Sequence, residues 1–241
     1  MDEQVMVPQA APSTGSGSLS FRGLAEVFYK PTAFFRELVE RPKVLVPYVA
    51  LGLILIAFLY LTRELVWEMV SQTPKFAEQM QNSPISPETM HKIFGYQYVF
   101  GGLIAMLCVP LLGAALALFW GNFVFAGKGR FKQLLSIVLY GEIIYAMGAI
   151  VNLALILPRG NLGANLSLGV LVASQGIDSV IYTALSKLAV FIIWEIIAIG
   201  VGLSVLYNTK ASRGYLISVL SVGMLSVLHI IFTAVGKMFQ G

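Results

Sequence analysis

Residues 134–157 read LLSIVLYGEIIYAMGAIVNLALIL, and this apolar run decides the fold. At a rise of about 1.5 Å per residue, such a helix is long enough to cross the hydrocarbon core of a bilayer, which is about 30 Å thick. Four further apolar runs have a similar length, so we expect five membrane-spanning helices. The other four cover residues 44–62, 98–120, 188–207 and 215–235.

The composition excludes a soluble globular domain. Of the 241 residues, 57% are hydrophobic and only 12% are charged, whereas a soluble domain has about a quarter charged. We therefore predict an all-α, polytopic helical bundle, with residues 44–241 forming one transmembrane domain. The net charge of +4 is interpreted as a sign of membrane orientation, and no nucleic-acid partner is expected.

The chain before the first run divides into two parts. Residues 1–20 are rich in Ser, Gly and Pro, which predicts a disordered tail. Residues 21–43 predict an amphipathic N-terminal helix, with Phe34 and Phe35 on one face and Arg36 and Arg41 on the other. This helix either lies in the interface with its phenylalanines in the acyl boundary or packs beneath the bundle, and the sequence leaves both alternatives open.

The distribution of Lys and Arg predicts the orientation. With the N-terminus in the cytoplasm, the inner segments hold ten of these residues and the outer segments hold six. Under the positive-inside rule, we expect a cytoplasmic N-terminus and a C-terminus on the opposite side. The residues expected to contact the inner membrane surface are Phe34, Phe35, Arg36, Arg41, Lys43, Lys128, Arg130 and Lys132.

Ionisable and polar residues within the runs are the candidate functional residues, because such groups are costly in hydrocarbon and usually face the bundle interior. They are Glu142, Glu195, His229 and Asn152. Counted from the inner boundary, Glu142 lies at a depth of about 12 Å, Glu195 at about 18 Å and His229 at about 21 Å. Glu195 and His229 are therefore expected at nearly the same level.

Two interpretations of these residues remain open. Glu142, Glu195 and His229 could line a path for a proton, a cation or a small polar ligand, or they could be hydrogen-bonded packing residues. Two Glu and one His are possible metal ligands, but they lack local ligand spacing, so no metal is predicted. Ser204 and His229 differ by about 16 Å in depth, which excludes a serine–histidine protease pair. No enzyme activity and no cofactor are expected.

Two stretches of the chain resemble the Yip1-domain family of five-span membrane proteins, in its prokaryotic form. The first is YKPTAFFREL at residues 29–38, followed by Arg41-Pro42 and the first apolar run. The second is GRFKQLLSIVLYG at residues 129–141. The resemblance covers about residues 25–238 and implies a bundle of five spans in a bacterial cytoplasmic (inner) membrane. It brings no catalytic residues, and the Asp-Leu-Tyr-Gly-Pro motif of the eukaryotic members is absent, so their Rab-GTPase binding is not carried over.

The sequence thus favours a non-enzymatic membrane protein of Yip1 type. We expect it to act through helix–helix and protein–protein contacts in membrane organisation or trafficking-like processes. The expected partners are membrane lipids and membrane or cytoplasmic proteins, including a second copy of the chain. The alternative is a channel or transporter with a path through Glu142, Glu195 and His229.

Overall fold

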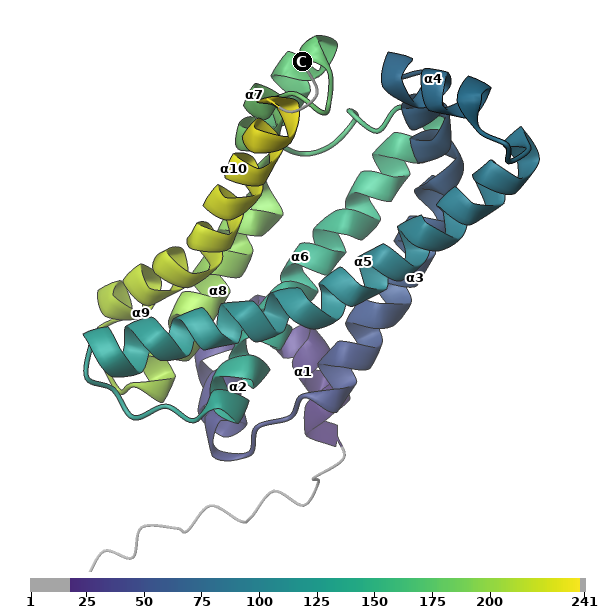
Figure 1. Ribbon diagram of the computed structural model, residues 1–241. Helices are drawn as coiled ribbons and strands as arrows, with labels where there is room; N and C mark the ends of the chain where they lie inside the picture. The colour runs from purple at the N-terminus through teal and green to yellow at the C-terminus, as the bar shows by residue number, and fades with distance from the viewer. Residues whose placement is uncertain (1–17, 239–241) are drawn as a thin grey trace, which may run out of the picture.

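The computed structural model describes residues 18–238, and helices account for nearly all of the regular structure there (Figure 1). Within that range no strand forms, and the β-type pairing recorded is a single isolated bridge between Ser167 and Ala189. The predicted all-α class is confirmed. The disordered tail was predicted for residues 1–20. Its first 17 residues lie outside the described part of the chain, and Ser18 begins a helix.

Four helical stretches are long and apolar enough to cross a bilayer: Leu45–Ser71, Pro87–Val124, Phe131–Arg159 and Ala211–Gly236. The first and third are α3 and α6. The second joins α5 (Pro87–Leu118) to the π-helical segment η1 (Phe119–Val124), and the fourth joins α9 (Ala211–Ser218), η3 (Val219–Gly223) and most of α10 (Met224–Met238). A further apolar helix, α8 (Val190–Leu206), has 17 residues. At about 1.5 Å per residue α8 reaches roughly 25 Å, which is at the short end for a span.

The most buried of the long helices is α6. In its most apolar stretch 67% of residues are buried, compared with 22% or less in the other three long helices. Glycines explain how closely α8 approaches it. A side chain at Gly141 would overlap Ile199, and one at Gly148 would overlap Phe191. Small residues at these two positions therefore allow α6 and α8 to pack together over this length.

Two short helices precede the bundle, α1 (Ser18–Tyr29) and α2 (Pro31–Glu40). The helix breaks at Lys30 because Pro31 disfavours a helical conformation in the residue before it. Phe34, Phe35 and Leu38 of α2 are buried, and the Phe34 ring lies 4.8 Å from that of Tyr140 on α6. Of the two alternatives for this amphipathic segment, the structure describes the helix packed beneath the bundle.

Shorter elements complete the chain at the opposite end of the bundle from α1 and α2 (Figure 1). They are α4 (Pro74–Asn82), between α3 and α5, and then η2 (Leu168–Gln175) and α7 (Val180–Ser186), between α6 and α8. Of these, η2 is a 3-10 helix of eight residues.

Candidate functional site

Glu142 of α6 and Glu195 of α8 are ionisable residues on two helices that pack against each other. Glu195 is only 4% exposed, and Glu142 is partly buried. The two carboxyl groups lie within electrostatic range of each other. They are near neighbours because Gly141 and Gly148 bring the two helices into contact on either side of Glu142.

Lys187 joins this cluster, although it was not among the residues predicted from the sequence. It lies between α7 and α8, where its Nζ atom is 3.0 Å from Nδ1 of His229 on α10. Burial lowers the pKa of the Lys187 ammonium group, and the nearby Glu195 carboxyl opposes that shift. The ring of His229 thus contacts Lys187. Lys187 also interacts electrostatically with Glu195.

The signal for Lys187 was its position just before an apolar run. A lysine there has a stem of four carbons, so its ammonium group can lie well away from its own backbone. Helix-depth counting gives the level of a backbone and not the reach of a side chain, which is why this residue was missed.

Asn152 has a different role in the structure. Its Oδ1 atom accepts a hydrogen bond of 3.0 Å from the backbone N–H of Leu166. This bond ties α6 to the connector that follows it, so the side-chain oxygen of Asn152 has a structural partner.

A cavity of about 220 Å³ lies between α3, α6, α8 and the connector 162–167. Asn152 and Lys187 form part of its polar wall, and Phe58, Ile156 and Phe191 belong to its apolar wall. None of Glu142, Glu195 and His229 lines it. The cavity therefore stops short of the two carboxyl groups, and of the candidates predicted from the sequence only Asn152 borders it.

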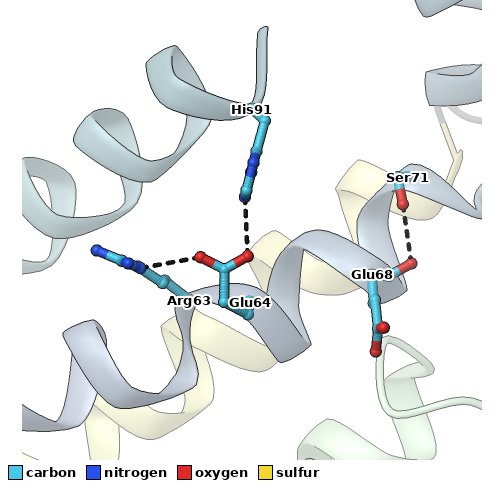
Figure 2. Close-up of polar contacts among 5 residues, drawn as sticks. All are labelled: Arg63, Glu64, Glu68, Ser71 and His91. Atoms are coloured by element: carbon cyan, nitrogen blue, oxygen red, sulfur yellow. Dashed lines mark hydrogen bonds and ion pairs between the residues drawn. The ribbon is translucent and has the colours of Figure 1, made fainter. Parts of the chain in front are cut away.

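A second polar cluster joins the C-terminal part of α3 to the start of α5 (Figure 2). Glu64 accepts from Arg63 through Oε1 and from His91 through Oε2, both at 3.0 Å. The His91 ring also lies 4.7 Å from the ring of Trp67. Ser71 donates to the backbone carbonyl of Glu68 one turn further along α3. Figure 2 shows one carboxylate shared by side chains from two helices, which is a structural link between them.

The predicted membrane-surface residues divide into two groups. Phe34 and Phe35 are buried against protein and Lys43 is half-buried. The other five are exposed, namely Arg36, Arg41, Lys128, Arg130 and Lys132. We refer to these five as the basic surface.

Hydrogen bonds hold the segments that carry the basic surface. Gln133 Nε2 donates to the Val39 carbonyl at 2.8 Å, and Ser136 bonds both backbone groups of Lys43, which joins α2 to α6. The loop 125–130 is fixed by Asn122, which accepts from the N–H of Gly129 and donates to its carbonyl.

Among residues 18–238 no group of three or more His, Cys, Asp and Glu side chains is arranged to hold a metal ion. No curated protein and no solved structure matches the chain. A model of the Yip1 domain matches residues 25–234. This match covers most of the 241 residues. It includes α2, α8, three of the long apolar helices and nearly all of the fourth, and the chain therefore belongs to the Yip1 domain family.

Proposed function

We propose that this Yip1-type membrane protein is not an enzyme and acts through contacts with other proteins, including further copies of itself, in membrane organisation. The observation that carries the proposal is the preformed basic surface. Buried Phe34 and Phe35 anchor α2, and Gln133 and Asn122 fix the neighbouring chain. A partner that binds there meets a surface that is already ordered, which lowers the entropic cost of association.

Photo-crosslinking tests this proposal directly. A photoreactive amino acid replaces Arg36, which is exposed on α2, and in a matched control it replaces Gln81, which is exposed at the other end of the bundle. We expect discrete protein adducts from position 36 and none from position 81. Equal labelling at both positions would contradict a role for the basic surface.

The surroundings of Glu195 support the same proposal. A transport path requires water to reach this carboxyl group, whereas Glu195 is 4% exposed and the described cavity ends before it. For a packing role, we expect Glu195→Gln to fold and assemble like the wild type, because Gln keeps the shape and the hydrogen-bonding groups. Glu195→Leu should mainly reduce assembly, as measured by size-exclusion chromatography in detergent.

A second candidate, a proton or cation path, is favoured by one observation. Lys187 is within electrostatic range of Glu195, bonds His229 and lines the cavity, so it lies between the buried carboxyl and the hollow. Ion flux into proteoliposomes separates the two candidates. A path requires flux that Glu195→Gln abolishes in a folded protein, and a contact protein gives no flux above that of empty liposomes.

For the topology, we propose five crossings with the N-terminus and the basic surface in the cytoplasm of a bacterial cell, α8 being the fourth crossing. The support is the excess of Lys and Arg in the segments at the α1–α2 end, together with the apolar character of α8.

A further inference from the structure

The cavity beside Lys187 carries one inference that does not depend on the proposed function. Its walls have two chemical characters. Asn152, Ser186 and Lys187 contribute polar groups, while Phe58 and Ile156 contribute apolar surface. The lining residues of α6 run from Tyr145 to Ile156, which is about 16 Å of helix. The hollow thus extends along the bundle and is amphipathic.

Two polar side chains of the lining, Asn152 and Lys187, have hydrogen-bond donors that remain available. Asn152 uses its carbonyl oxygen to accept from Leu166, and its amide N–H groups have no partner among residues 18–238. The Lys187 ammonium group has three N–H donors. One of them is directed at His229. Within the described chain Lys187 is the one charged residue in the lining, and no Asp or Glu borders the cavity. Donors with one positive charge match an oxyanion.

The apolar walls indicate what carries the oxyanion. Phe58 lies on α3, Ile156 on α6 and Phe191 on α8, all of them apolar helices. Lys187 lies just before α8 begins at Val190, and Asn152 lies two turns before α6 ends at Arg159. The polar part of the cavity is therefore near the ends of these apolar helices, where lipid headgroups meet the hydrocarbon. From this geometry we propose that the cavity binds the anionic headgroup of a membrane phospholipid, with the phosphate at Lys187 and Asn152.

Native mass spectrometry of the detergent-purified full chain tests the proposal. The probes are phosphatidylglycerol, phosphatidylcholine and inorganic phosphate. We expect one tightly retained phosphatidylglycerol, weaker binding of phosphatidylcholine, and no displacement of the lipid by an equal concentration of inorganic phosphate. Binding of both lipids with one affinity would overturn the requirement for an anionic headgroup. Displacement by inorganic phosphate would overturn the lipid as the source of the anion.

Two variants locate the binding in the cavity. Lys187→Met removes the charge. Asn152→Asp keeps an oxygen for the Leu166 N–H and replaces the free donors with a negative oxygen. Each should weaken binding of phosphatidylglycerol by about tenfold or more, since a charge-assisted hydrogen bond contributes at least that factor. Lys92→Met is the matched control, because Lys92 is exposed at the same end of the bundle and pairs with Glu88. Equal binding by Lys187→Met and Lys92→Met would overturn the site.

The lipid-binding experiment and the crosslinking experiment can fail independently of each other. Loss of lipid binding in Lys187→Met together with unchanged crosslinking at position 36 supports the lipid site alone. Unchanged lipid binding in both folded variants would contradict the lipid site and would not affect the proposed role of the basic surface.

Discussion

Gly214 illustrates a position where one methyl group decides the packing. It lies on α9 against α8, and a Cβ added there would overlap the Gly200 carbonyl oxygen and lie 2.7 Å from the Ser204 nitrogen. Both are backbone atoms that cannot rotate away. We expect Gly214→Ala to destabilise the protein by about 1–3 kcal/mol, the usual range for overpacking, as a lower midpoint of thermal unfolding in detergent.

The control for that substitution is Gly101→Ala on α5. Nothing lies within 4 Å of a Cβ added at Gly101, so the substitution changes only helix propensity, which favours Ala by up to about 1 kcal/mol. If both variants unfold like the wild type, α8 and α9 are not packed as described.

Ser136 is a buried hydroxyl with two backbone partners. It is 0% exposed, accepts from the Lys43 N–H at 3.1 Å and donates to the Lys43 carbonyl at 2.7 Å. Ser136→Ala leaves both backbone groups unpaired, which costs about 1–3 kcal/mol. The measurement is the unfolding midpoint in denaturant, with exposed Ser212→Ala as the control. A midpoint shared by the two variants would show that this link between α6 and the segment joining α2 to α3 is not made.

The link between α3 and α5 through Glu64 and His91 should act locally. His91→Ala removes the contact with Glu64 and the packing on Trp67. Because exposed ion pairs contribute about 0–1 kcal/mol, we expect little change in global stability but several-fold faster amide hydrogen exchange in the first turns of α5. Lys92→Ala, on the next residue of α5, should not change that exchange. Equal rates in the two variants would contradict the link.

At the level of elements, the features that depend on the length and hydrophobicity of a segment could be predicted from the sequence. The all-α class and the long apolar helices follow from runs such as 134–157, since few other structures satisfy the backbone in lipid. The break at Lys30 also has a local cause in Pro31. The direction in which Phe34 points has no local cause, because an amphipathic face fits a lipid boundary and a protein groove equally well. The contact of Phe34 with the Tyr140 ring depends on how α2 and α6 are assembled.

The candidate site was harder to predict because it depends on side chains that cross between elements. Depth counting along each helix brought Glu195 and His229 to one level. The structure instead shows Lys187 in contact with His229 and in range of Glu195. Lys187 comes from a connector that carries no periodic pattern. The cavity depends on how α6, α8 and the connector 162–167 are spaced, and that is a property of the assembled bundle.

For the whole molecule, the distribution of charged residues and the arrangement of the helices distinguish the same two ends of the bundle. The basic surface and the loops around Lys128 and Lys210 share the end formed by α1 and α2, while α4 and α7 lie at the other (Figure 1). Because a bilayer separates the two ends of such a bundle, one membrane-impermeant reagent can distinguish them. The chain suits this experiment, since Cys108 is its one cysteine.

The experiment uses Cys108→Ser as the parent and introduces Gln81→Cys or Lys128→Cys, both at exposed positions separated by α5. We expect an impermeant maleimide to label Gln81→Cys in intact cells and Lys128→Cys only after the cells are opened, because basic loops stay in the cytoplasm. The reverse pattern would place the basic surface outside and remove its cytoplasmic partners. Labelling of both positions in intact cells would mean that α5 does not cross the membrane, since α5 is the one long apolar helix between them.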